Sequence, residues 1–218
     1  MKGLLIKDLL LLKNQQRFFL LIFFMSAGML LVGVNSVFVI NYVTLIFTMF
    51  TLNSISYDEF DNGYAFLFTL PITRNQYAAE KYVFGFVTGG SACIIVTIFA
   101  VFMNFVRGGG AGTLELVITA LLYLFISLLF MAVVVPVQLK FGTEKGRIVL
   151  IFIIGIIFAA GFIVVKAAKT FQLDLSTMVA ALTSFAEGSV IAVLLLFSLA
   201  AVFVSYFISV NIMKKKQF

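Results

Sequence analysis

The residues best suited to chemistry in this chain lie in one short segment, where Asp58, Glu59 and Asp61 fall within four positions. A ridge of aromatic and aliphatic side chains follows these carboxylates at once. The ridge contains Tyr64, Phe66, Leu67 and Phe68. Carboxylates can pair with basic groups of another protein while the ridge fills an apolar groove, so the pattern is typical of a docking surface. A solvated hairpin with its aromatic rings among lipid headgroups is the alternative.

Residue types that most enzymes and metal sites need are nearly missing. The chain has no His and a single Cys, Cys93, in the middle of an apolar run. Zinc proteases and haem proteins draw their ligands from His, and rhomboid-type proteases need a Ser–His pair. We therefore expect no metal, no cofactor and no intramembrane catalysis, and we expect Cys93 to be a small core residue.

The composition requires a membrane. Of 218 residues, 63% are hydrophobic and 11% are charged, with a mean hydropathy of +1.18. A soluble domain is about 45–50% apolar and about 25% charged. Six runs are each apolar and long enough to cross a bilayer, and they cover residues 18–34, 37–55, 82–106, 114–139, 148–165 and 189–213. The sequence therefore predicts an all-α integral membrane protein with six transmembrane helices.

Basic residues predict the orientation of these spans. If the N-terminus is cytoplasmic, twelve of the 15 Lys and Arg residues lie in cytoplasmic segments, and only Arg107, Lys166 and Lys169 lie outside. This asymmetry and the even number of spans place both termini in the cytoplasm. The net charge of +6 then reflects topology, and a nucleic-acid partner is not needed to explain it.

The first 16 residues predict an amphipathic helix in the membrane interface. One face of this helix carries the apolar side chains Leu5, Ile6, Leu9 and Leu12. Asp8 is among the polar side chains expected on the opposite face. A simple membrane anchor with no further role is the alternative.

Two other connections are long enough to have structure of their own. Residues 56–76 form the one long cytoplasmic connection, and Pro71 would end a short helix within it. Residues 166–188 predict either an ordered external loop or a re-entrant segment. Glu80 and Lys81, at the inner end of the third run, and Glu115, at the outer end of the fourth, are expected within reach of water. Glu115 is either a residue of the outer mouth or an ordinary interfacial carboxylate.

Small residues predict close helix packing at two places. Gly85 and Gly89 are four positions apart in the third run, and Gly155 and Ala159 are four positions apart in the fifth. Pro136 is expected to kink the fourth run, with a neighbouring helix satisfying the carbonyl that Pro136 leaves unbonded.

Together these features resemble the permease subunits of type-two ATP-binding-cassette exporters. The resemblance rests on the six runs, the N-terminal segment, the basic loop of residues 140–147, and the acidic connection that ends in Leu70-Pro71-Ile72-Thr73-Arg74. Small permeases of bacterial peptide exporters, such as those for phenol-soluble modulins, are the most similar group.

The resemblance implies a set of partners. The three acids from Asp58 to Asp61 and the ridge of residues 64–68 would form a coupling helix docked on a separate cytoplasmic ATPase subunit. That ATPase works as a dimer and binds ATP and Mg. A second permease, either a copy or a paralogue, would pair with this chain around the translocation path.

We therefore expect a transport subunit without catalysis of its own in a bacterial plasma membrane. It would export a hydrophobic or amphipathic substrate, and a peptide fits this expectation best. A partner-independent secondary carrier or small channel is the alternative. Coupled carriers call for charges at the middle of the spans or for paired broken helices, and the sequence shows neither.

Overall fold

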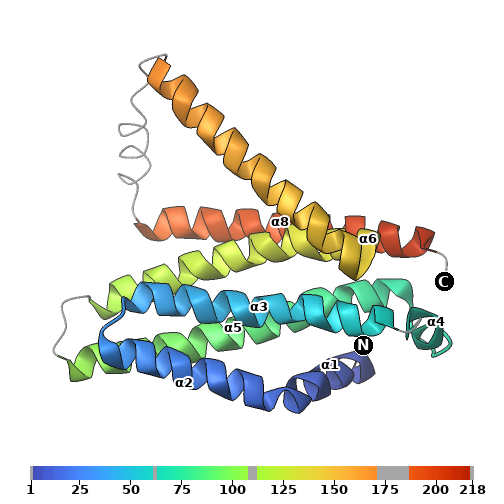
Figure 1. Ribbon diagram of the computed structural model, residues 1–218, viewed down its shortest axis with the longest axis horizontal. Helices are drawn as coiled ribbons and strands as arrows, with labels where there is room; N and C mark the ends of the chain where they lie inside the picture. The colour runs from blue at the N-terminus through green and yellow to red at the C-terminus, as the bar shows by residue number, and fades with distance from the viewer. Residues whose placement is uncertain (1, 61–62, 108–111, 171–186, 217–218) are drawn as a thin grey trace.

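The computed structural model describes residues 2–60, 63–107, 112–170 and 187–216, and these residues form a bundle of helices without a strand (Figure 1). The helices are α1 (Lys2–Asn14), α2 (Gln16–Val32), α3 (Ser36–Glu59), α4 (Gly63–Leu67), α5 (Arg74–Val106), α6 (Thr113–Thr170) and α8 (Glu187–Lys215). The all-helical prediction is therefore confirmed for the described part of the chain. The N- and C-termini lie at the same end of the bundle (Figure 1).

Four helices, α3, α5, α6 and α8, are long and apolar enough to cross a membrane. The helices α1 and α2 meet at an angle of 64°, and this bent pair makes a fifth candidate span. A sixth span requires that the two halves of α6 cross separately. This helix has 58 residues, or about 87 Å of length, against about 30 Å for the hydrocarbon core. The count of six and the orientation in the membrane stay predictions.

The helix α6 is divided by a single residue. Gly142 has φ 74° and ψ −177°, a left-handed conformation that interrupts the helix and that glycine adopts without strain. After this break the helix leaves the bundle at an angle (Figure 1). The prediction of a basic loop at residues 140–147 is therefore wrong, because the residues on both sides of Gly142 are helical.

Local signals explain where the other helices begin and end. The helix α2 ends at Gly33, whose φ is 96°, and α3 begins after Asn35, whose side chain accepts a hydrogen bond from the backbone of Val37. Thr73 and Gln76 form a reciprocal capping box at the start of α5. As a result α3 and α5 extend beyond the apolar runs, and only residues 60–73 connect them.

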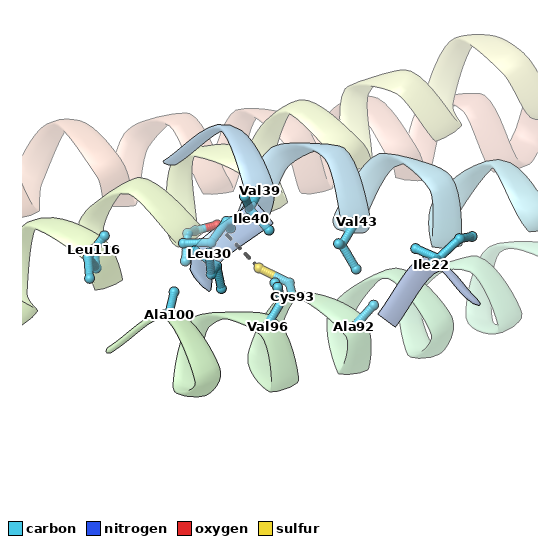
Figure 2. Packing of buried hydrophobic residues seen from close by; sticks show 11 residues of the cluster. Ile22, Leu30, Val39, Ile40, Val43, Ala92, Cys93, Val96, Ala100 and Leu116 are labelled. Carbon is cyan, nitrogen blue, oxygen red and sulfur yellow. Dashed lines mark hydrogen bonds between the residues drawn. The ribbon is translucent and has the colours of Figure 1, made fainter. Parts of the chain in front are cut away.

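One buried hydrophobic cluster lies where α2, α3, α5 and the first half of α6 meet. Figure 2 shows Cys93 reaching from α5 in among Leu30 and Ile40. The side chain of Cys93 is buried, and its Sγ lies 3.6 Å from the carbonyl oxygen of Ala120. The prediction that Cys93 is a core residue is confirmed.

The predicted pair of small residues on α5 packs closely against neighbouring helices, whereas the pair in the second half of α6 does not. A Cβ at Gly85 would overlap Met131 and Thr51, and a Cβ at Gly89 would overlap Thr48, so both glycines lie where α5 approaches its neighbours. A Cβ at Gly155 would meet no atom within 4 Å, and Ala159 is exposed. Packing through this second pair, across a dimer, stays a prediction.

Pro136 has no backbone N–H to bond the carbonyl four residues earlier in α6, and a side chain of α8 bonds that carbonyl instead. The carbonyl of Ala132, four residues before Pro136, accepts a 2.6 Å hydrogen bond from the hydroxyl of Ser205. Ser205 and Ser209 also bond the hydroxyl of Tyr82 on α5. The predicted satisfaction of this carbonyl by a neighbouring helix is confirmed, and it ties α5, α6 and α8 together.

The third connection lies mostly outside the described residues. The helix α6 continues to Thr170 and α8 begins at Glu187, so residues 166–170 and 187–188 are helical. The loop and re-entrant alternatives both concern residues 171–186, which the structure does not describe.

Candidate functional site

A buried ionic cluster joins α1, α3 and α5 at the end of the bundle that holds both termini. Lys81 of α5 is fully buried, and its Nζ lies 2.5 Å from Oδ2 of Asp8 and 2.7 Å from Oδ2 of Asp58. The Nζ of Lys81 also donates to Ser54 at 2.6 Å. One ammonium group thus holds a carboxylate from α1 and a carboxylate from α3.

Further groups complete this cluster. Lys7 pairs with Asp58 and lies 3.0 Å from Asp8, and the hydroxyl of Tyr77 donates to Asp58 at 3.0 Å. Glu80 is also fully buried, 3.4 Å from Lys81, but its carboxyl oxygens accept no hydrogen bond within the described residues. The charges of Asp8, Asp58 and Lys81 are paired and hydrogen-bonded across three helices, as buried charges must be, so each of these helices depends on the other two.

Two expectations about these residues are wrong. Asp8 does not lie on a solvated face, and Glu80 and Lys81 are not within reach of water, because none of the three has exposed surface. The side of α1 that faces the protein carries Leu4 and Asp8, whereas Ile6 and Leu9 are exposed. A buried carboxylate needs a cation or hydrogen-bond donors, and α1 turns Asp8 toward Lys81, which supplies both.

The predicted docking residues do not share one surface. Asp58, Tyr64 and Leu67 are buried, with 6%, 3% and 7% of their surfaces exposed, so they are not available to another protein in this structure. Tyr64 packs edge-on against Tyr77 inside the bundle, and burial raises the pKa of its phenol.

The other predicted docking residues lie differently. Phe66, on the short helix α4, is 73% exposed. Phe68 is half-buried and packs against Tyr77 and Arg74. Asp61 lies outside the described residues. The part of the predicted ridge that faces outward is therefore narrow and centred on Phe66.

Glu59 makes its contacts within the chain. Its Oε2 accepts hydrogen bonds from the backbone N–H of Thr143 at 2.7 Å and from the Thr143 hydroxyl at 2.8 Å. Its Oε1 lies 3.8 Å from Nζ of Lys216. Burial lowers the pKa of Lys216, and the Glu59 carboxylate offsets part of that effect. The last residue of α3 therefore contacts the break in α6 and the end of α8.

A groove of about 770 Å³ opens beside these contacts. It lies between the end of α3 and the start of the second half of α6. Its lining includes Asn53, Ser56, Tyr57, Glu59, Phe60, Phe141, Thr143, Glu144, Lys145 and Arg147. Tyr57 and Phe60 are 51% and 72% exposed. The groove thus combines exposed aromatic rings with charges of both signs, the composition of an interface rim and its anchors.

Two other polar residues lie apart from the cluster. Arg74 donates to the carbonyls of Met213 and Lys214 at 2.9 and 2.6 Å and so caps the end of α8. Glu115 is exposed in the first turn of α6, at the opposite end of the bundle from the cluster (Figure 1). Its role at an outer mouth stays a prediction.

The sequence assigned Asp58 and Glu59 to a docking surface and did not predict the buried cluster with Lys7, Asp8, Ser54 and Lys81. The four-residue spacing of polar residues on α3 and α5 could have indicated the cluster. Ser54 and Asp58 are four positions apart on α3, and Tyr77 and Lys81 are four positions apart on α5, so each pair presents polar groups on one face of a helix.

The comparisons with known proteins agree with the helical membrane fold. A family model described as ABC-2 family transporter protein matches residues 3–214, which is nearly the whole chain. No curated protein and no solved structure matches it.

Proposed function

The chain belongs to the ABC-2 family of transporter proteins, and from this premise we propose that it is the permease subunit of an ATP-driven exporter. As a member of this family it is a multi-pass membrane protein and a transport subunit. Membership of the family also implies an ABC ATPase as its partner. The proposal adds that two copies of the ATPase bind ATP and Mg and drive the export of a hydrophobic or amphipathic substrate, with a peptide as the best fit.

The observation that carries the proposal is the exposed aromatic surface at the end that holds both termini. Phe66 on α4 and the groove residues Tyr57 and Phe60 are large, apolar and exposed. This end is also the one predicted to face the cytoplasm, because Lys and Arg gather in its connections. Exposed aromatic side chains beside charges are the usual anchors of a protein interface, and the ATPase is a cytoplasmic protein.

The buried residues of the connection have a supporting role in this proposal. Asp58 and Tyr64 hold the connection against α1 and α5, so that Phe66 is presented on a rigid base. A rigid base is needed because movement of the ATPase reaches the transmembrane helices only if the contact does not deform. In this proposal the exposed Phe66 contacts the ATPase, while the buried Asp58 and Tyr64 hold the connection in place.

The remaining parts of the proposal concern the assembly and its setting. We place the protein in a bacterial plasma membrane and pair it with a second permease, either a copy or a paralogue. The second half of α6 supports such pairing because it leaves the bundle (Figure 1) and exposes apolar residues along its length, Ile151 at 70% and Phe158 at 75% among them. Lipid covers whatever part of this surface the second permease leaves.

The proposal is tested by co-purification with the ABC ATPase encoded beside the chain. Phe66→Ala is expected to weaken the complex by about 2–4 kcal/mol, the usual range for a buried aromatic anchor at an interface. Phe105→Ala is the matched control, because Phe105 is 83% exposed but lies near the far end of α5. Equal binding by the wild type and both variants would remove Phe66 from the interface, and absence of any wild-type complex would refute the proposed function.

A further inference from the structure

The end of α3 and the break in α6 are built around the same carboxylate. Glu59 is the last residue of α3, and its Oε2 accepts two hydrogen bonds from Thr143 at 2.7 and 2.8 Å. Thr143 is the first residue after the non-helical Gly142. A Cβ on Gly142 would overlap the carboxylate of Glu59. The absence of a side chain at Gly142 therefore lets the Glu59 carboxylate approach the backbone at the break.

The chemistry of this contact is that of a helix cap. The first N–H groups of a helix have no acceptor inside it, and the positive end of the helix dipole attracts an anion. Glu59 supplies the acceptor and the negative charge from a different helix, 84 positions away in sequence. The carboxylate is 29% exposed and has Nζ of Lys216 3.8 Å away. The cap is therefore shielded in part from water but is not locked inside the core.

The second half of α6 has few other attachments in this chain. From Ile148 onward its side chains are exposed or half-buried, apart from three whose placement is not described, and Figure 1 shows it leaving the bundle beyond the break. Residues 143–170 are helical and extend about 42 Å at 1.5 Å per residue. A turn of about 10° at the base of such a helix moves its tip by about 7 Å. A small displacement at the break is thus amplified along the helix.

We propose that Glu59 is a positioning residue that transmits movement of the 60–73 connection, together with the helices α1, α3 and α5 that hold it, into the second half of α6. The inference rests on the proposed function, because the movement comes from the ATPase bound at Phe66. Glu59 immediately precedes that connection and holds the base of the projecting helix, so it links the outer contact to a span. The buried cluster around Lys81 fixes α1, α3 and α5 to one another and leaves the second half of α6 as the element that turns.

Two readouts separate this role from a merely structural one. The first is the distance between spin labels on exposed cysteines at Phe38 of α3 and Phe158 of α6, with the native cysteine replaced by serine. The second is the substrate-stimulated ATP hydrolysis of the complex. Thr143→Val removes the hydroxyl donor but keeps the backbone bond, whereas Thr143→Ser keeps both donors.

Glu59→Ala and Thr143→Val are expected to broaden the label distance and leave co-purification with the ATPase unchanged. Stimulated hydrolysis is expected to fall by at least about tenfold in Glu59→Ala, which loses two charge-assisted hydrogen bonds, and less in Thr143→Val, which loses one. Thr143→Ser, which keeps both donors, should behave as the wild type.

Three results would overturn the inference. Wild-type distances in both test variants would show that Glu59 does not hold the helix. Broadened distances with wild-type stimulation would show that the cap is structural only. Failure of the wild-type chain to bind the ATPase refutes the proposed function and, with it, the transmission, while the label distances still report whether the cap exists.

Discussion

Replacing Lys81 with methionine is expected to destabilise the protein more than any surface substitution. Methionine has a similar volume and no charge, so the change removes the ammonium group and little packing. The fully buried Lys81 is the direct partner of Asp8 at 2.5 Å and of Asp58 at 2.7 Å. Without it, three buried carboxylates, those of Asp8, Asp58 and Glu80, lose their shared cation.

The geometry sets the size of this effect. Removing one partner from a buried ion pair typically costs about 3–5 kcal/mol, because an uncompensated charge remains. Lys7 stays close to two of the carboxylates, bonded to Asp58 and 3.0 Å from Asp8, and it compensates part of the loss. We therefore expect the lower end of the range, about 3 kcal/mol, which lowers the folding equilibrium constant about a hundredfold.

The single cysteine provides the assay. Cys93 is buried in the core and is the only thiol in the chain, so its rate of reaction with a thiol reagent in detergent reports the unfolded fraction. The double variant Asp8→Asn with Lys81→Met should lose less stability than the sum of the single variants, because the second change removes one of the charges left unpaired by the first. A loss below about 1 kcal/mol for Lys81→Met would contradict the account of the cluster as a structural junction.

Further predictions concern the spans and their topology. Ser205→Ala should cost about 1–3 kcal/mol, because the carbonyl freed by Pro136 loses its donor, and combining it with Pro136→Ala should recover part of that loss in the same thiol assay. Gly89→Val should destabilise the protein by separating α5 from α3, whereas Gly90→Val, at a position where a Cβ meets nothing within 4 Å, should be close to neutral. A cysteine at Gly112 should react with an impermeant thiol reagent in intact cells, while one beside the break in α6 should not; the reverse pattern would overturn the predicted orientation.

Much of the fold follows from patterns that extend over a few neighbouring residues. Apolar runs locate the helices, and the Gly33 and Asn35 caps mark the turn between α2 and α3. Pro136 indicates a carbonyl that a neighbour must satisfy, and the structure supplies Ser205. Each of these features depends on local backbone chemistry, which a sequence displays directly.

The candidate site was harder to predict because its contacts join distant parts of the chain. Asp8 and Lys81 are 73 positions apart, and Glu59 and Thr143 are 84 apart. Helical periodicity assigns a charged residue to the polar face, and it carries no information about a cation on another helix that lies opposite. The break at Gly142 was missed for a related reason, since a basic segment between two apolar runs suggests a loop and gives no hint that one left-handed residue suffices.

The most direct test of the central claim is transport by the reconstituted complex. Vesicles that contain this chain and its ABC ATPase, with the ATP-binding side outward, should accumulate an amphipathic peptide when ATP and Mg are added. The chain alone should neither hydrolyse ATP nor accumulate peptide. Accumulation driven by a proton gradient in vesicles that contain only this chain would contradict the account and favour a partner-independent carrier.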